Sequence, residues 1–328
     1  MPFESVAVIG GGSWGTALAQ AAAIAGRSVQ LVVRDQAQSD EINQQRTNSR
    51  YLAGQSLHNA IHAVTDAAPA DIVILAVPAQ ASRSALGAID AATLVGKPVV
   101  LSAKGLETGT LQRQSEILAD MAPGALPFVL SGPSFAADVA AGRPTAVTLA
   151  GDDAELTSTL AAALAGPSFR PYAADDRIGV EIAGALKNVY ALACGAVDGA
   201  QLGASARSAL IARAYAEMAR MVSAMGGSAH TLTGLAGLGD LTLTCTSVQS
   251  RNYQFGMALG RGQSVEAIIA SGAKLAEGVA TTPVADALAK SLAVDAPLIA
   301  AVQAVLGGQA DISTVVAGLM SRPLKRET

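Results

Sequence analysis

Residues 6–35 read VAVIGGGSWGTALAQAAAIAGRSVQLVVRD, and this stretch decides the fold of the first half of the chain. Gly10, Gly12 and Gly15 form a G-x-G-x-x-G pattern between a β-branched run and an alanine-rich segment. In a strand–turn–helix–strand unit, such glycines permit a tight turn, close backbone approach to a pyrophosphate and close helix–sheet packing. A glycine-rich turn without a ligand is the alternative, but this context favours a dinucleotide site with the phosphates at the helix N-terminus.

The residues that follow the second β-branched run bear on which dinucleotide is used. An acidic residue about twenty positions beyond the glycines binds the ribose 2′-hydroxyl of NAD, whereas an arginine accommodates the 2′-phosphate of NADP. Here Arg34 precedes Asp35, which is at the nominal spacing of the acid. The order favours NADPH and leaves NADH open, as it does a simple ion pair on a solvated loop.

Composition narrows the class of protein. Of the 328 residues, 51% are hydrophobic and only 15% are charged, which excludes a disordered chain and, at this length, suggests two domains. The net charge of −4 argues against a nucleic-acid partner. We expect no membrane insertion and no signal peptide, and therefore a cytoplasmic protein. The sequence leaves open whether the chain works alone or as a homodimer.

The first half alternates apolar runs with helix-like segments, which predicts an open, doubly wound α/β sheet. After about residue 175 the text becomes helical segments separated by glycine-rich turns. We therefore expect a Rossmann-type domain over 1–176 and an all-α domain over 177–328. The strands are expected at 5–9, 28–33, 71–77, 98–103, 128–131 and 145–149, and the helices between them near 15–26, 39–48, 79–90, 111–122 and 152–165.

Two lysines stand in apolar surroundings. Lys104 follows a predicted strand and precedes Gly105, so its ammonium should overhang the edge of the sheet where ligands bind in this fold; a surface lysine in a loop is the equal alternative. Lys187 lies in a predicted helix whose neighbouring turns offer no carboxylate. Its ammonium must either extend to solvent, the commoner outcome, or be desolvated, which lowers its pKa toward the range of a general acid or base.

Histidines and cysteines offer no further site. His58 and His62 lack the glutamate of a zinc-protease motif and are expected in a loop, and His230 stands alone. Cys194 and Cys245 match no metal or redox spacing and are expected to be buried or to line a site. The sequence indicates no metal site.

With these residues in view, the chain resembles the bacterial-type NAD(P)-dependent glycerol-3-phosphate dehydrogenases from Gly10 to about Thr282. The motifs that carry the resemblance are GGGSWGTALA (10–19), SAKGLE (102–107), SGPSFA (131–136), ALKNVYALACG (185–195), GLGDLTLTCTS (237–247), SRNYQFG (250–256) and AEGV (276–279). The resemblance implies a helical substrate domain after the dinucleotide domain. It also implies interconversion of sn-glycerol 3-phosphate and dihydroxyacetone phosphate, a step that supplies glycerophospholipid synthesis.

The resemblance also assigns residues. Lys187 corresponds to the catalytic proton acceptor, and Lys104 to a residue that touches both cofactor and substrate and is the alternative base. The remaining substrate contacts would be Gly132, Ser134, Asp240, Ser250, Arg251 and Asn252. The cofactor contacts would be the glycine loop with Ser13 and Trp14, together with Arg34, Ala136, Arg251, Leu275 and Glu277.

One part of this assignment also has a chemical reason. A three-carbon phosphate is small and dianionic, and Arg251 can meet two of its oxygens, with Ser250 and Asn252 as neutral donors. Two features depart from the family pattern: Asp35 follows Arg34, and Leu275 stands where the family often has a smaller branched residue. The competing interpretations are another reductase of this architecture, of the β-hydroxyacid or ketopantoate type, and a non-catalytic dinucleotide sensor.

Overall fold

The computed structural model describes residues 3–272, 276–324 and 326. The described part of the first half forms a sheet with strand order β3-β2-β1-β4-β5-β6-β7-β8. Neighbouring strands run parallel except β6 and β7, which are antiparallel. The strands are β1 (Ser5–Ile9), β2 (Ser28–Val32), β3 (Ile61–Val64), β4 (Ile72–Leu75), β5 (Pro98–Leu101), β6 (Leu126–Ser131), β7 (Thr145–Gly151) and β8 (Phe169–Ala174).

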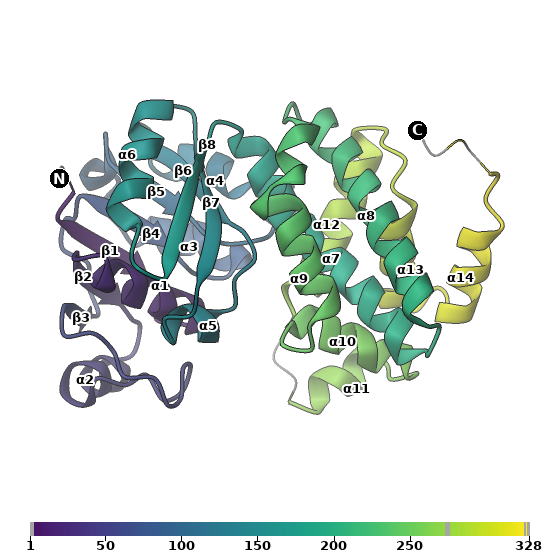
Figure 1. Cartoon of the computed structure of the whole chain (residues 1–328), viewed down its shortest axis with the longest axis horizontal. Helices are drawn as coiled ribbons and strands as arrows, with labels where there is room; N and C mark the ends of the chain where they lie inside the picture. Colours follow the sequence, from purple (N-terminus) through teal and green to yellow (C-terminus); the bar gives the residue numbers. More distant parts are fainter. Residues whose placement is uncertain (1–2, 273–275, 325, 327–328) are drawn as a thin grey trace.

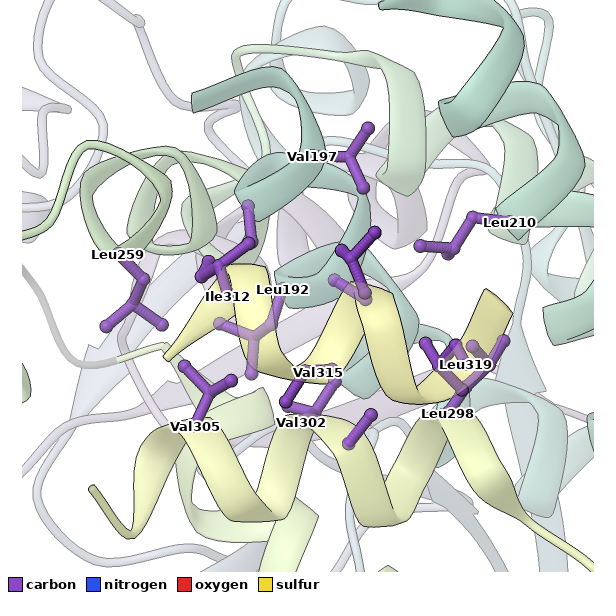
Figure 2. A pocket seen from close by; sticks show the side chains of 14 residues that line it. Leu192, Val197, Leu210, Leu259, Leu298, Val302, Val305, Ile312, Val315 and Leu319 are labelled. Carbon is purple, nitrogen blue, oxygen red and sulfur yellow. The ribbon is translucent and has the colours of Figure 1, made fainter. Parts of the chain in front are cut away.

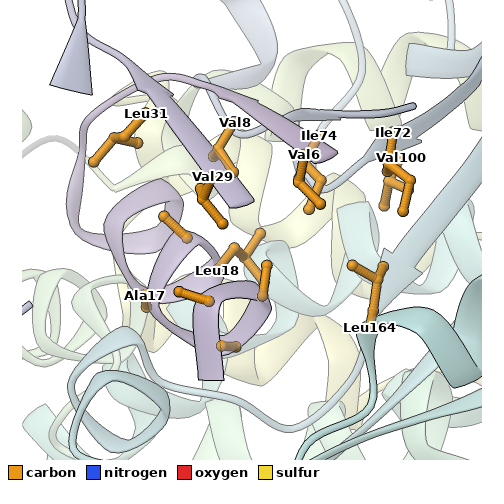
Figure 3. Close-up of a cluster of buried hydrophobic side chains, with 14 of the residues drawn as sticks. Val6, Val8, Ala17, Leu18, Val29, Leu31, Ile72, Ile74, Val100 and Leu164 are labelled. Carbon is orange, nitrogen blue, oxygen red and sulfur yellow. The ribbon is translucent and has the colours of Figure 1, made fainter. Parts of the chain in front are cut away.

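Helices cover both faces of this sheet, as the sequence predicted. Alternate residues of β1 and β4 face opposite ways, so Val6 and Ile72 join one apolar cluster while Ala7 and Val73 join another. Figure 3 shows Leu18 of α1 and Leu164 of α6 below the first face. The helices are α1 (Ser13–Ile24), α2 (Gln36–Gln45), α3 (Ser82–Gly87), α4 (Gln114–Met121), α5 (Ala136–Ala140) and α6 (Ala154–Leu164), with 3₁₀ turns η1 (Ala79–Ala81) and η2 (Ala91–Leu94).

The structure corrects three sequence expectations in this half. His62 lies on β3, not in a loop, although its side chain is exposed. β8, with the sequence FRPYAA, was not expected. Both are edge strands, where one polar face and even a proline are tolerated, so neither shows the continuous apolar run of a central strand. The segment expected as one helix over 79–90 is instead η1 followed by α3.

The second half is helical and lies beside the sheet (Figure 1). Its central helix is α7, which packs against α8, α9, α10 and α12 and also touches β6. The helices are α7 (Arg177–Gly199), α8 (Ala204–Ala224), α9 (Asp240–Thr246), α10 (Arg251–Gly260), α11 (Val265–Ala270), α12 (Glu277–Ser291), α13 (Pro297–Leu306) and α14 (Ile312–Met320), with the 3₁₀ turn η3 (Ala229–Thr233) and the π turn η4 (Leu235–Gly239).

Glycines allow α7 and α10 to pack with their backbones in contact. A Cβ on Gly195 of α7 would lie 2.0 Å from the carbonyl oxygen of Tyr253, and one on Gly256 of α10 would lie 2.0 Å from that of Leu192. No side chain fits at either position. This close crossing fixes the start of α10, and hence residues 250–252, relative to α7.

α7 also has the length and apolar composition of a membrane span, but 89% of its apolar window is buried inside the protein. Among the described helices it alone passes that test of length and composition. Burial of this kind is what a helix at the centre of a folded core shows.

Candidate active site

The glycine loop joins β1 to α1 and has the shape that a phosphate cradle needs. Gly10 has φ 114°, and a Cβ there would lie 2.7 Å from the carbonyl oxygen of Ala76. A Cβ on Gly15 would lie 1.9 Å from the carbonyl oxygen of Gly10. Gly12, by contrast, faces open space: a Cβ there would meet nothing within 4 Å. It caps α1 without a side-chain hydrogen bond, so the amides of the first turn remain available to an anion.

A cleft of ≈ 870 Å³ opens in front of this loop. Arg34 and Asp35 line it together with Gly10 and Gly12, so the structure brings the expected selectivity residues to the loop. Both side chains are exposed. Asp35 caps α2 by accepting a hydrogen bond from the amide of Ala37 at 2.9 Å. The volume of the cleft, the open Gly12 and the free helix end together fit a dinucleotide.

Sequence reasoning missed a second segment at this cleft, residues 48–51. Arg50 and Tyr51 line the cleft, and the carbonyl oxygen of Tyr51 accepts a hydrogen bond from the Ser13 hydroxyl at 2.8 Å. The segment lies in a loop with no regular pattern, so only its proximity in space identifies it.

Trp14 lies in the first turn of α1, the helix that Gly12 caps. Its ring packs against the apolar cluster on the α1 face of the sheet, and the ammonium of Lys104 is 6.0 Å from the ring centroid. Its indole N–H is buried, without a hydrogen-bond partner among the described residues. The cofactor loop is therefore in contact range of the first lysine.

The two lysines meet at one carboxylate. Lys104 donates to Asp240 Oδ2 at 2.7 Å and to the carbonyl oxygen of Gly132 at 3.1 Å. Lys187 donates to Asp240 Oδ1, and to the Thr244 hydroxyl at 2.8 Å. We call Lys104, Lys187 and Asp240 the lysine cluster. The side chains of Lys187 and Asp240 are 7% and 1% exposed. Lys187 therefore does not extend to solvent, which was the commoner expectation, because a carboxylate that the neighbouring turns of α7 do not offer comes from α9.

Burial sets the proton affinity of this cluster. Desolvation lowers the pKa of Lys187 to about 8; Asp240 acts against this change and Lys104 adds to it. Burial alone would raise the pKa of Asp240, but the charges of the two lysines hold it below its ordinary value. The cluster thus contains an anionic carboxylate and an amine that can gain or lose a proton near neutral pH.

Asn188 and Thr244 were not singled out from the sequence. Thr244 follows Asp240 by one helical turn, a spacing that could have indicated it. Asn188 donates to the carbonyl oxygen of Lys104 at 3.0 Å and accepts from the Asn252 amide at 2.8 Å. Asn252 in turn accepts from the Gly278 amide at 2.9 Å. This chain of hydrogen bonds links the Lys104 loop with α7, α10 and α12.

The segment after β6 contributes backbone groups. Gly132 has φ 146°, and a Cβ there would lie 2.9 Å from the Val147 Cα. Its carbonyl oxygen accepts hydrogen bonds from Lys104 and, at 3.0 Å, from the Ser134 hydroxyl. Ala136 begins α5 and packs against the α1-face cluster. Gly132 and Ser134 therefore lie beside Lys104, whereas Ala136 lies on the side of the glycine loop.

The start of α10 presents the remaining polar groups. Ser250 is buried and caps the helix, accepting from the Tyr253 amide at 3.3 Å, whereas Arg251 is exposed. Burial raises the pKa of Glu277, and the positive charges of Arg251, Lys104 and Lys187 partly offset that rise. Glu277 thus lies within electrostatic range of both Arg251 and the lysine cluster. Leu275, the other expected distal contact, lies outside the described residues.

The helical half also contains two buried cysteines and a second pocket. Cys194 and Cys245 are both buried, and burial, together with a hydrogen bond to Cys194, raises the pKa of Cys245. The described residues contain no group of three or more histidine, cysteine or acidic side chains placed to hold a metal ion. A small apolar pocket of ≈ 60 Å³ lies between α14 and the helices beneath it (Figure 2), lined by residues such as Leu192, Val302 and Val315.

A phosphate cradle at a doubly wound sheet, next to a buried lysine with a lowered pKa at the junction with a helical domain, defines a two-domain dinucleotide-dependent dehydrogenase. The N-terminal profile of the NAD-dependent glycerol-3-phosphate dehydrogenases matches residues 5–157, and the C-terminal profile matches residues 176–317. The chain belongs to this family.

Individual relatives agree. The chain is 47% identical over 330 residues to the Caulobacter vibrioides glycerol-3-phosphate dehydrogenase [NAD(P)+], covering 100% of both chains. It is 50% identical over 325 residues to the enzyme of that name from Methylobacterium radiotolerans, covering 98% of this chain and 97% of the relative. The crystal structure of glycerol-3-phosphate dehydrogenase from Coxiella burnetii superposes with a TM-score of 0.90 at 38% identity, covering 98% of this chain and 99% of that one.

Proposed function

We propose that the protein interconverts sn-glycerol 3-phosphate and dihydroxyacetone phosphate with a nicotinamide dinucleotide. The observation that carries the proposal is the lysine cluster: a buried amine with a pKa of about 8, held by Asp240 and Thr244, beside a lysine in contact range of the cofactor loop. The family and the full-length relatives support it. The bound dinucleotide supplies or accepts the hydride.

Lys187 moves the proton. In the oxidation, the neutral amine takes the proton of the hydroxyl on the central carbon; in the reduction, the ammonium returns a proton to the carbonyl oxygen. Asp240 and Thr244 accept hydrogen bonds from the Lys187 amine and so orient it. Lys104 binds the same carboxylate as Lys187, so its positive charge would lie near the oxygen of the reacting carbon and stabilise negative charge that develops there. Lys104 remains the alternative base.

The substrate phosphate would bind at the start of α10. Arg251 is exposed there, and its guanidinium can meet two phosphate oxygens. Ser250 and Asn252 flank it, and Asn252 uses one of its two amide hydrogens on Asn188. Gly132 and Ser134 lie beside Lys104 and would contact the carbon end of the substrate.

NADPH is the proposed preferred cofactor and NADH the alternative. Asp35 accepts a hydrogen bond from the first turn of α2, while Arg34 lines the cleft with an exposed side chain. The glycine loop, Ser13, Trp14 and Ala136 would hold the rest of the dinucleotide, with Leu275 and Glu277 at its far end.

The wider setting follows from the resemblance. We place the domain boundary between residues 176 and 177, a position supported by the end of β8 at Ala174 and the start of α7 at Arg177. The proposal includes three further points. The protein acts in the cytoplasm without inserting into a membrane, it forms a homodimer, and it supplies glycerol 3-phosphate for glycerophospholipids.

Loss of the reduced-nicotinamide absorbance on addition of dihydroxyacetone phosphate is the direct test, run in parallel with NADPH and NADH. Ketopantoate and a β-keto acid serve as competing substrates. Turnover of dihydroxyacetone phosphate alone is the expected result. Turnover of a competitor instead would identify another reductase, and cofactor binding without any turnover would identify a sensor.

A further inference from the structure

Two arginines from separate segments line the cleft in front of the glycine loop. Arg34 follows β2, and Arg50 lies in the loop after α2. Both side chains are exposed. The ion pairs found among the described residues do not include either of them. Neither guanidinium is held in an ion pair with a described residue, so both can bind an anionic ligand in this cleft.

The loop that carries Arg50 is fixed to the glycine loop by hydrogen bonds on both sides of Arg50. The buried Asn48 amide donates to the carbonyl oxygen of Gly11 at 3.0 Å and to the Thr16 hydroxyl at 2.8 Å. On the other side, the Ser13 hydroxyl donates to the carbonyl oxygen of Tyr51 at 2.8 Å. The backbone of Arg50 is therefore held beside the site where the dinucleotide phosphates would bind.

The same bonds relate Arg50 to α2, which begins just after Arg34. Gln38 of α2 donates to the carbonyl oxygen of Gly11 at 2.7 Å and to the Asn48 side chain at 3.2 Å. The carbonyl oxygen of Gly11 therefore accepts hydrogen bonds from both α2 and the 48–51 loop, which holds both segments near the end of β2. In this fold, the ribose of the adenosine half lies at that end of β2.

The guanidinium of Arg50 is also oriented. It stacks over the ring of Tyr51, 5.3 Å from the centroid, which limits the conformations of a long side chain while keeping its donors available. The described acidic residues that line the cleft are not in an ion pair with either arginine. Asp35 accepts a hydrogen bond from the Ala37 amide, Asp66 from the Thr65 hydroxyl and Asp90 from the Ala92 amide. The positive side chains thus retain their donors for a ligand.

We infer that Arg50 and Arg34 together form a clamp for the 2′-phosphate of NADPH. A ribose 2′-phosphate is a monoester that carries close to two negative charges at neutral pH, and two guanidinium groups can each meet it with two hydrogen bonds. NADH presents only a hydroxyl at that position. Arg50 is then a specificity-determining residue, and the inference rests on the proposed preference for NADPH.

Binding measurements test the clamp without any turnover. Trp14 is the single tryptophan of the chain and lies in the first turn of α1, next to the glycine loop, so its fluorescence should change when a dinucleotide binds. Calorimetric titration measures the affinities of the fragments. NADPH, NADH and the fragments 2′,5′-ADP and 5′-AMP would be titrated into the full-length protein. The variants are Arg50→Ala, Arg50→Lys, Arg34→Ala and the double alanine variant. Arg170→Ala is the matched control: Arg170 stacks over Tyr172 at 5.8 Å, on the edge strand β8 at the other end of the sheet.

Arg50→Ala should weaken NADPH and 2′,5′-ADP about ten- to over a hundredfold, the range expected for charged hydrogen bonds. NADH and 5′-AMP should change less than about twofold, and Arg50→Lys should fall between wild type and Arg50→Ala. Arg170→Ala should bind all four ligands like the wild type.

Equal losses for NADPH and NADH in Arg50→Ala would overturn the inference, because they would place Arg50 on the adenine. No loss would overturn it as well. The proposed cofactor preference fails separately, and is recognised separately, if wild type itself binds NADH as tightly as NADPH. If the wild type prefers NADPH and Arg50→Ala keeps that preference, Arg50 does not bind the 2′-phosphate, and the proposed preference for NADPH still holds.

Discussion

The glycine loop and the lysine cluster differ in how their polar groups are used before a ligand binds. The loop offers a ligand backbone amides and exposed arginines, and its key position, Gly12, is defined by having nothing near it. The cluster buries Lys187 and Asp240, and the partly buried Lys104 binds the same carboxylate. A charged ligand can enter the first region without displacing protein contacts. In the second region, the protein has arranged the charges before the substrate arrives.

This difference decides how each region responds to mutation. Removing one partner of a buried ion pair leaves an uncompensated charge and costs several kcal/mol, on the order of 3–5. Lys187 can be removed more safely than Asp240, because Asp240 keeps Lys104. Removing Asp240 would leave two ammonium groups facing each other. Variants of Lys187 therefore report on chemistry, and variants of Asp240 also report on folding.

The largest effect should come from Lys187→Met, which keeps the length of the side chain and removes the amine. The loss of the proton-transfer group should lower kcat about 10²–10⁴-fold. Steady-state rates with dihydroxyacetone phosphate measure this, while Trp14 fluorescence should show little change in cofactor affinity. If Lys187→Met keeps a near-normal kcat and Lys104→Met is inactive, the two lysines exchange roles.

Arg251→Ala should cost about ten- to over a hundredfold in kcat/KM for the phosphorylated substrate, through the loss of charged hydrogen bonds. Unphosphorylated dihydroxyacetone should be an almost equally poor substrate for wild type and variant. Arg261→Ala, at the exposed C-terminal end of the same helix, is the matched control. Equal losses on both substrates would show that Arg251 does not bind the phosphate.

The pH dependence should have opposite signs in the two directions of the reaction. Lys187 has a pKa of about 8, so below that value its amine is protonated. Oxidation needs the neutral amine, and its kcat/KM should rise about tenfold per pH unit until the pH passes about 8 and then level off. Reduction needs the ammonium and should decline above that pH. If kcat/KM does not change with pH around 8 in either direction of the reaction, Lys187 is not the group that titrates in catalysis.

Two glycines of the same loop should separate binding from folding. Gly12→Val places its side chain in open space, so the protein should keep its melting temperature and lose dinucleotide affinity. Gly15→Ala would put a methyl group 1.9 Å from a backbone oxygen and should cost about 1–3 kcal/mol of stability. Thermal melts and Trp14 titrations measure both. If the Gly12→Val protein folds and binds the cofactor normally, the glycine loop is not the phosphate-binding site.

The last effect concerns stability rather than activity and lies at Glu217 on α8. This buried carboxylate accepts hydrogen bonds from the amides of Leu298 and Ile299 at 2.9 Å, and burial raises its pKa to about 7. The folded protein therefore binds a proton here that the unfolded chain releases near its ordinary pKa of 4.5. Stability from this group is present at low pH and is lost as the pH rises toward about 7, by at most about 1.4 kcal/mol per pH unit.

Denaturant titrations at several pH values measure this contribution. Glu217→Gln keeps an acceptor for one of the two amides and removes the titration, so its stability, although lower, should depend less on pH across that window. An identical pH dependence in wild type and Glu217→Gln would show that Glu217 does not titrate there.

Central elements followed from the sequence, and peripheral ones did not. The strands β1, β2, β4, β5, β6 and β7 lie within a residue or a few of their expected positions, because strands covered on both faces read as continuous apolar runs. β3 and β8 were not predicted from the sequence, because an edge strand such as Ile61–Val64 alternates buried and exposed positions. The segment 48–51 was not predicted to line the cleft either, because its loop has no hydrophobic periodicity.

The sequence by itself determined the contacts that are local along the chain. Gly10, Gly12 and Gly15 shape one turn between adjacent elements, so their spacing in the text is also their arrangement in space. Arg34 and Lys104 follow strands directly, and all parallel strands end at one edge. These features required only the rules of the βαβ unit.

Only the tertiary structure decided the state of the lysines. Lys187 and Asp240 are 53 residues apart and Lys104 and Asp240 are 136 apart, so no local pattern relates them. From the text, Lys187 could extend to solvent or be buried, and the choice depended on whether a carboxylate reached it. The packing of α9 against α7 supplies that carboxylate and excludes water, and the two together bring the pKa of Lys187 to about 8. Desolvation is a property of everything that surrounds a group, and the chain has surroundings only after it has folded.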